Sequence, residues 1–277
     1  LFSQDVIDYC MENGIVLGKY TDLWGTNNYQ AAEVIFARRV GDTSSPEYDN
    51  FPIGMENANS GNCPTQTLVD AYEMKNGGEP DPANPYEGRD PRFKMTIACN
   101  GDKWPDSNPN PLATYIGGRN GAPISYATPT GYYLKKYLDG SIDISAGSGT
   151  GGKRHSWITF RLGEFYLNYA EIMYELGNEE QAREYVNKVR GRQSVNMPPV
   201  TVSGEKLRDK IRNERRVELA FEGHRFFDVR RWGIADKTEN RDLLAMNIQK
   251  KEDGSKTYEI SLLLKRSFLE QHKLVPI

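Results

Sequence analysis

Cysteine is scarce in this sequence, and the three cysteines are not arranged for a metal site or for a complete set of disulfides. Cys10, Cys63 and Cys99 show no CxxC spacing, and an odd number leaves at least one thiol unpaired. The three histidines are also far apart and form no HExxH motif. The sequence therefore provides no ligand set for a metal ion, and we expect no cofactor.

An excess of positive charge and long apolar runs are also absent. The formal net charge is -3, and no block of Lys and Arg occurs, which argues against a nucleic-acid partner. No run of about 18 apolar residues could span a membrane, and residues 1–6 lack the features of a signal peptide. Because the chain starts at Leu1 rather than Met, we interpret it as a mature fragment or a truncated chain.

Glycine and proline are abundant, with 26 and 15 residues, and they predict long irregular connections in a globular protein. Residues 1–157 are predicted to be a loop-rich ligand-binding region, and residues 158–277 a helical region, together forming one folded unit. In the first region we expect helices over 3–13 and 64–74, strands over 33–37, 93–99 and 132–138, and loops over 41–64 and 100–130.

The helical region shows apolar residues at three- and four-residue steps. This spacing predicts a helix over 158–176, a second helix over 178–192 capped by Asn178, and a third over 204–222. The first two form an αα-hairpin. The aromatic residues Phe226, Phe227 and Trp232 are expected to pack on that hairpin because they are too apolar to be left in water.

Two motifs resemble binding loops but lack essential residues. Residues 147–153 match GxGxxG, but Arg154 stands where a P-loop needs Ser or Thr, and no βαβ unit surrounds them. A flexible loop is therefore favoured over a phosphate site. Residues 106–110 imitate the start of an EF-hand, but Pro111 occupies the glycine position, which excludes a calcium loop of that type.

Acidic residues are more plausible as ion-pair partners than as catalysts. Glu164 and Glu171 share a helix face with an apolar stripe, so we expect ion pairs with Arg161 or with the third helix rather than a glycosidase pair. Residues 214–228 place Glu214, Glu218 and Glu222 in one row. We interpret this segment as a partly buried network that stabilises helix packing, neutralised by Arg215 and Arg225.

Several segments in order resemble the SusD/RagB family: PTQTLVDAYEMK at 64–75, RDPRF at 89–93, RLGEFYLNYAE at 161–171, NKVR at 187–190, and residues 214–232. The terminal residues 274–277 resemble the start of the family's closing segment. The resemblance covers the chain from about residue 30 onward. It implies a mostly α fold, an α-α superhelix with tetratricopeptide-like helix pairs such as 161–192, long loops and a few short strands.

The same resemblance implies a non-enzymatic glycan-binding protein at the cell surface. Such a protein delivers oligosaccharides or polysaccharides to a SusC-like TonB-dependent transporter in the outer membrane of a Gram-negative bacterium of the Bacteroidota type. A lipid anchor would attach it to the membrane, but this chain contains neither the lipid-attachment cysteine nor the usual N-terminal repeats. A peptide-binding member of the family and a glycan-degrading enzyme are the alternatives.

Glycan binding needs flat aromatic rings beside hydrogen-bonding groups, and the loop over 100–130 contains both. The other tryptophans, Trp24, Trp157 and Trp232, are expected in the core because they lie beside helical stripes. Trp104 itself could also pack under the loop. The candidate ligand-binding residues are Trp104, Asp106, Asn108, Tyr115, Arg119 and Tyr126.

Overall fold

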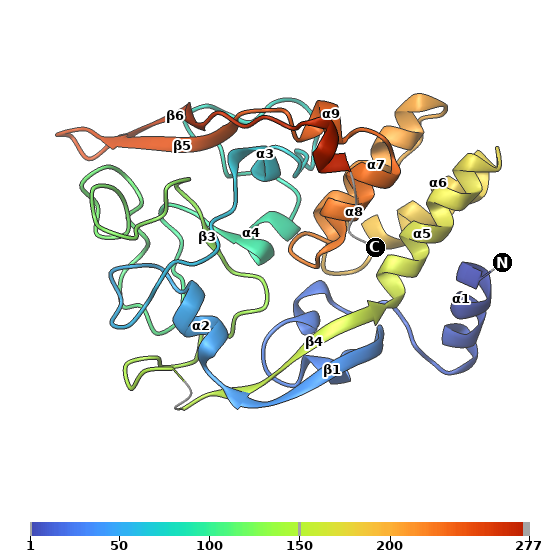
Figure 1. The fold of residues 1–277 in the computed structure, drawn as a ribbon, viewed down its shortest axis with the longest axis horizontal. Helices are drawn as coiled ribbons and strands as arrows, with labels where there is room; N and C mark the ends of the chain where they lie inside the picture. The colour runs from blue at the N-terminus through green and yellow to red at the C-terminus, as the bar shows by residue number, and fades with distance from the viewer. Residues whose placement is uncertain (1, 149–150, 274–277) are drawn as a thin grey trace.

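The structure is a computed structural model that describes residues 2–148 and 151–273. Figure 1 shows helices gathered on one side, irregular segments on the other, and a long β-hairpin across one end of both. The longer helices are α1 (Phe2–Glu12), α5 (Leu162–Glu175), α6 (Glu179–Arg190), α7 (Glu205–Glu218) and α8 (His224–Arg231). The shorter ones are α2 (Ser45–Asn50), α3 (Gln66–Val69), α4 (Arg92–Thr96) and α9 (Ala235–Thr238), with 3-10 turns η1 (Tyr20–Leu23), η2 (Asn28–Gln30) and η3 (Glu270–Lys273).

The strands pair two by two, and each pair is antiparallel. They are β1 (Val34–Thr43) with β4 (Lys153–Arg161), β2 (Ile97–Ala98) with β3 (Tyr133–Leu134), and β5 (Leu243–Lys250) with β6 (Lys256–Leu264). In the described part of the chain no larger sheet forms, so the fold is mostly helical with a few short strands, as the sequence predicted.

The αα-hairpin is confirmed. Helices α5 and α6 pack together with α1 and α7 around a buried apolar cluster that includes Leu167, Val186 and Ile211. Asn178 caps α6 by accepting a hydrogen bond from the backbone N of Gln181 at 3.2 Å. This is the tetratricopeptide-like helix pair expected over 161–192.

Several predicted boundaries were wrong, because tertiary pairing decided the local structure. Residues 158–161, the predicted start of a helix, instead belong to β4, since they pair with β1, and α5 begins only at Leu162. The third helix, α7, ends at Glu218 instead of residue 222. Phe226 and Phe227 were expected to be buried, but they are 45% and 56% exposed on α8.

The loop-rich region differs in the same way. Residues 93–99 begin as the short helix α4, initiated by Asp90, whose carboxylate accepts the backbone N–H of Arg92 at 2.9 Å, and only Ile97 and Ala98 are extended. The predicted loop over 41–64 contains the end of β1 and the helix α2, while the expected strand over 132–138 and helix over 64–74 are shortened to β3 and α3. Of the glycine-rich segment 147–153, residues 149–150 lie outside the described residues, as do residues 274–277.

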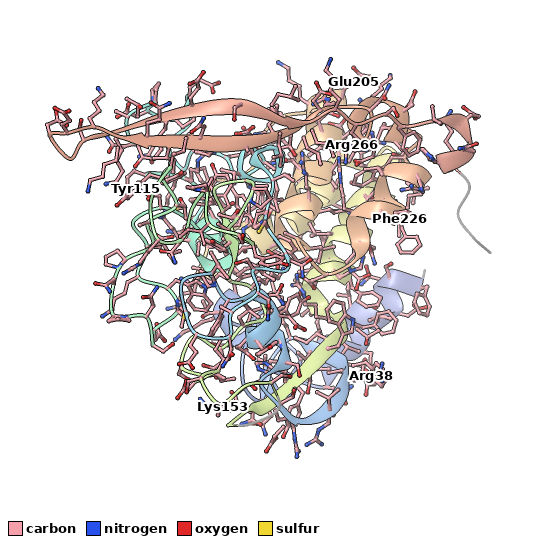
Figure 2. The ribbon with its side chains drawn as sticks, turned by 60° about the vertical axis from the view of Figure 1, so that its left-hand side comes forward. Arg38, Tyr115, Lys153, Glu205, Phe226 and Arg266 are labelled. Carbon is pink, nitrogen blue, oxygen red and sulfur yellow. The ribbon has the colours of Figure 1, made fainter. Side chains whose placement is uncertain are left out.

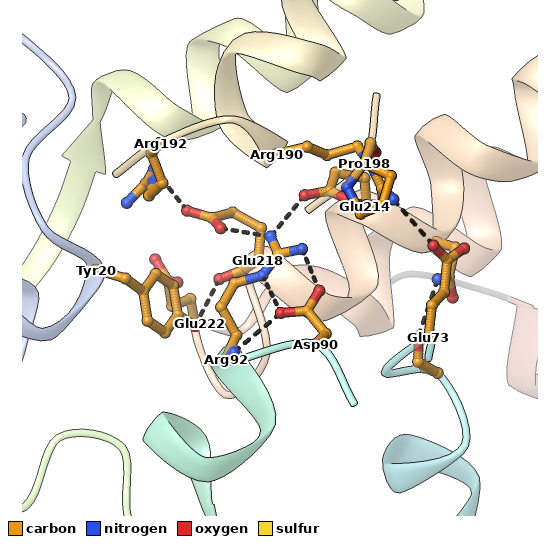
Figure 3. Close-up of polar contacts among 12 residues, drawn as sticks. Tyr20, Glu73, Asp90, Arg92, Arg190, Arg192, Pro198, Glu214, Glu218 and Glu222 are labelled. Carbon is orange, nitrogen blue, oxygen red and sulfur yellow. Dashed lines mark hydrogen bonds and ion pairs between the residues drawn. The ribbon is translucent and has the colours of Figure 1, made fainter. Parts of the chain in front are cut away.

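A network of buried ion pairs joins these elements (Figure 3). Arg92 of α4 contacts Glu214 at 2.6 Å and Glu218 at 2.8 Å, while Arg161 at the end of β4 contacts Glu218 at 2.8 Å and Glu222 at 2.7 Å. Their side chains are at most 4% exposed. The remaining members of the network are Glu33, Glu73, Asp90, Lys136, Arg190 and Arg192.

The predicted network therefore exists, but the predicted partners were wrong. Arg215 pairs with Asp228 at 3.1 Å, and Arg225 lies 3.9 Å from Glu239. Neither neutralises the Glu row, whose cations come from α4, β4, α6 and the segment after β3. Since these segments are remote in sequence, helical spacing along α7 could not identify them.

Candidate ligand-binding site

Two of the six predicted binding residues are buried in the core. The Trp104 ring is 5% exposed and meets Phe51 edge to face, with ring centroids 5.9 Å apart. Asn108 is 4% exposed, and its amide nitrogen donates to the carbonyl oxygen of Trp104 at 3.3 Å. In this structure Trp104 has no open face on which a sugar could stack.

The other four predicted residues are more accessible but do not converge. Tyr115 is half-buried beneath the β5–β6 hairpin (Figure 2), with Lys250 Nζ 5.4 Å from its ring centroid. Arg119 donates to the carbonyl of Pro111 at 2.5 Å. Tyr126 is 83% exposed, and Asp106 is also exposed.

An aromatic pocket forms elsewhere, between β4 and the segment that follows β3. It has a volume of about 360 Å³ and is lined by the stacked rings of Tyr137 and Trp157, whose centroids are 5.1 Å apart with 20° between the planes. Trp24, which directly follows η1, meets the Tyr137 ring edge to face, with the ring centroids 4.7 Å apart. Trp157 nevertheless stays 46% exposed.

Tyr137 is held firmly in this arrangement. Its φ of 73° lies in the left-handed region, which a bulky side chain rarely adopts and which functional sites often retain. Burial raises the pKa of the Tyr137 hydroxyl well above its usual value, with Glu222 adding to the rise and Arg161 opposing it. The hydroxyl is thus close to the ion network, while the ring contributes to the pocket.

Amide and imidazole groups complete the lining of the pocket. The side-chain Oδ1 of Asn50 accepts hydrogen bonds from the backbone N and the side-chain amide N of Asn62, at 3.0 and 2.8 Å. His155 Nε2 lies 3.0 Å from a carboxylate oxygen of Glu47. Asn28 is fixed by two hydrogen bonds to the backbone of Ser156, at 2.7 and 3.0 Å. An aromatic face beside several polar groups that are held in place is the combination that sugars require.

Sequence reasoning missed this pocket because it placed Trp157 beside a helical stripe and therefore in the core. In the structure Trp157 lies in β4, opposite Arg38 of β1. Along a strand neighbouring side chains point to opposite faces, and Trp157 is exposed where Ser156 and Ile158 are buried. Residues 157–160 are all aromatic or β-branched, and this composition was the available signal for a strand.

Another pocket, of about 620 Å³, contains the two carboxylates that were considered for catalysis. Glu171 accepts hydrogen bonds from both terminal nitrogens of Arg231 and from Trp232 Nε1, and it lies 3.9 Å from Arg215 of α7. The expected ion pair with the third helix is therefore confirmed for Glu171. Glu164 lies 3.9 Å from His224 instead, and burial raises its pKa. With Glu171 held by cations and an indole, the pair does not resemble a free acid and base.

Within residues 2–148 and 151–273, no group of three or more His, Cys, Asp or Glu side chains is placed to hold a metal ion. In the same residues no helix has both the length and the apolar character needed to cross a membrane.

Comparisons of the sequence and of the fold with known proteins all point to the same family. The profile of the SusD family matches residues 32–271. A SusD-like protein of Formosa agariphila is 26% identical over 235 residues, which are 79% of this chain and 43% of that protein. A SusD-like protein from Bacteroides fragilis, with a solved structure, is 31% identical and superposes with a TM-score of 0.78 over 98% of this chain and 58% of its own.

A second solved structure from Bacteroides fragilis, a SusD-like carbohydrate binding protein, is 27% identical with a TM-score of 0.76. The match covers 99% of this chain and 58% of that one. The chain thus spans about half the length of the relatives that it matches.

Proposed function

Because the chain belongs to the SusD family, we propose that it is part of a non-enzymatic cell-surface protein that binds oligosaccharides and delivers them to a SusC-like TonB-dependent transporter of the outer membrane. The solved relative that is a carbohydrate binding protein supports the ligand class. A lipid anchor on the longer protein would account for a place at the membrane surface.

The observation that carries the proposal is the half-exposed Trp157 ring stacked on Tyr137 beside the Asn50, Asn62 and His155 side chains. A ring supported on one side and open on the other is a platform for the apolar face of a sugar. The neighbouring amides and imidazole would hydrogen-bond to sugar hydroxyls. The loop over 100–130 is proposed as a second contact, through Tyr115, Tyr126, Asp106 and Arg119.

The test is a pair of substitutions in one strand. A glycan array first identifies a neutral oligosaccharide that the protein binds, and calorimetry then measures its dissociation constant. Trp157→Ala should weaken binding about fivefold, because an aromatic platform contributes roughly 1 kcal/mol beyond its buried area. Phe160→Ala is the matched control, since Phe160 is equally exposed at 45% on β4. Equal affinities for Trp157→Ala and the unmodified protein would exclude this pocket as the glycan-binding site.

The alternatives are separated by the same preparations. Binding of extended peptides instead of glycans would favour the peptide-binding interpretation. Release of reducing sugars by the pure protein, abolished by Glu164→Gln without loss of folding, would favour an enzyme. We expect no release, because Glu171 is engaged by Arg231 and Trp232.

A further inference from the structure

A second cavity, of about 380 Å³, has a lining whose charged side chains are mostly basic. It lies between α3, the end of α7, α8, α9 and the start of β5. Figure 2 shows two of its residues, Phe226 on α8 and Arg266 near the hairpin. The basic side chains are Arg215, Arg216, Arg225, Arg241 and Arg266.

The arginines outnumber the carboxylates that face them in the described part of the chain. Asp228 is already held by Arg215 at 3.1 Å and by Arg231 at 2.8 Å. Glu239 is the other carboxylate in the lining, and it lies 3.0 Å from Arg266 and 3.9 Å from Arg225. Among the described residues, Glu239 is therefore the one carboxylate that forms an ion pair with the group Arg216, Arg225, Arg241 and Arg266.

Several donors of this group are not matched by acidic acceptors. Arg216 donates to the carbonyl oxygen of Thr67 at 2.7 Å, and neither Arg216 nor Arg241 has an ion pair with a described residue. The Nε atom of Arg266 is buried without a hydrogen-bond partner among the described residues. A buried donor without an acceptor is costly, so the site favours an additional acceptor.

The electrostatics differ from those of the central network. Burial, together with Arg225 and Arg241, lowers the pKa of Arg216 to about 10 against the opposing effects of Glu239 and Asp70. Burial also lowers the pKa of Arg225, with Arg241 and Arg266 contributing and with Glu239 and Asp228 opposing. In the central network the pKa of Arg161 is instead raised above its usual value, because burial is outweighed there by Glu222, Glu218 and Glu33. Arg216 and Arg225 are repelled by the other arginines, and the carboxylates near them do not outweigh the effect of burial.

The rest of the lining suits a polar, ring-shaped ligand. Thr65, Thr67 and Thr238 supply hydroxyl groups, each with remaining hydrogen-bonding capacity. Phe226 is 45% exposed and presents an aromatic ring at the edge of the cavity. A neighbouring cavity shares Arg225 and Phe226 with this one, so the basic surface continues beyond it.

We propose that this arginine pocket binds the carboxylate or sulfate group of an acidic sugar, so that the protein's ligand is an acidic oligosaccharide. Guanidinium groups match planar oxyanions with paired hydrogen bonds, and hydroxyl and aromatic groups beside them fit the sugar ring that carries the anion. The formal net charge of -3 argues against a nucleic acid as the ligand. The inference depends on the proposed function, since it names the class of glycan.

The test compares an acidic and a neutral trisaccharide, trigalacturonate and maltotriose, by calorimetry at two salt concentrations. Arg241→Gln and Arg266→Gln should each weaken trigalacturonate binding about five- to tenfold and reduce its salt dependence. Both should leave any maltotriose binding unchanged. Lys206→Gln is the control, because it removes one positive charge from an exposed side chain in the first turn of α7, which lines neither the arginine pocket nor the aromatic pocket.

Every other outcome would overturn the inference of an acidic sugar ligand in this pocket. Neutral binding without acidic binding would overturn this inference and leave the proposed function intact, whereas absence of any glycan binding would remove both. If only inorganic sulfate bound, or if an acidic peptide bound with the same sensitivity to Arg241→Gln, the acidic sugar would be excluded. Equal weakening by Lys206→Gln would show a general charge effect and would also overturn the assignment of the anionic group to this pocket.

Discussion

Two tryptophans of this protein, Trp104 and Trp157, lie in opposite environments, one buried and one half-exposed. Trp104 is enclosed by Phe51 and by Gly140, where a Cβ atom would lie 2.6 Å from the indole ring. Lys135 Nζ lies 5.2 Å from the same ring. Trp157, in contrast, is supported by Tyr137 and half-exposed. Burial of a tryptophan is decided by the atoms around it, so the chemistry of the side chain alone could not separate the two.

At this scale we predict that Trp104→Ala destabilises the fold. Removing a buried indole leaves a cavity, which costs about 3–5 kcal/mol in the free energy of unfolding. Urea denaturation followed by circular dichroism measures this loss. Tyr126→Ala is the control, because its ring is 83% exposed and its loss should change stability by less than about 0.5 kcal/mol. A folded Trp104→Ala variant with lost glycan affinity and normal stability would restore Trp104 as a binding platform.

Among the elements, the β5–β6 hairpin was not predicted from the sequence. The turn signal Asp253-Gly254 between two extended segments was available, and Gly254 does adopt a φ of 84°. The hairpin crosses the loop-rich side and the helices (Figure 1), and β5 attaches to the body through the backbone of Met246, whose N donates to the carbonyl of Thr130 at 2.9 Å. It therefore forms one wall of the loop-rich region.

Gly131 allows this close attachment. Its φ is 84°, and a Cβ atom there would lie 2.5 Å from the carbonyl oxygen of Met246. We predict that Gly131→Ala displaces β5 and lowers the free energy of unfolding by more than Gly101→Ala. Gly101 has a similar φ of 90° but open space around it, so it reports the backbone strain alone, about 1 kcal/mol. Equal losses in thermal denaturation experiments would mean that the contact with β5 is unimportant.

At the scale of the whole molecule, the buried ion network joins segments that are far apart in sequence. Gly163 at the start of α5 leaves room for it, because a Cβ atom there would lie 2.6 Å from a guanidinium nitrogen of Arg161. Nearly every carboxylate in the network meets at least two cations, and Glu218 meets three, Arg92, Arg161 and Arg192. A buried ion pair stabilises the fold only while both partners are charged, so the stability of the protein depends on pH.

The acid stability of the protein follows from these carboxylates. Burial alone would raise the pKa of Glu218, but Arg192, Arg161 and Arg92 hold it well below its usual value. The pKa of Glu222 is lowered as well, by Arg161 and Lys136 against the effect of burial. The unfolded chain, where these pKa values are near 4.5, therefore takes up protons first as the pH falls. Their stabilisation is fully present above that pH and is lost below it.

We predict that the melting temperature falls steeply between about pH 4.5 and pH 2. Glu218→Gln should lower the free energy of unfolding by about 3–5 kcal/mol at neutral pH, because it leaves buried arginines without their partner. Its stability should then fall less steeply below pH 4.5 than that of the unmodified protein. Parallel pH profiles for the two proteins would show that Glu218 does not contribute to the acid transition.

The local sequence was sufficient where a segment's structure depends on its own periodicity. The stripe that includes Leu162, Tyr169 and Met173 predicts α5, and Asn178 marks the start of α6. An apolar face and a capping residue can both be recognised from neighbours within four positions. The order of the motifs likewise predicted the family, and the abundance of glycine and proline predicted the long loops.

The tertiary structure decided everything that depends on partners remote in sequence. Residues 153–161 became a strand because β1 offers backbone groups to pair with, and this turned Trp157 outward beside Tyr137. The same distance in sequence hid the cations of the Glu row and the grouping of Arg216, Arg225, Arg241 and Arg266 around one cavity. Hydrogen bonding, stacking and charge neutralisation act over a few ångströms in space, so only the folded chain determines which of these side chains meet.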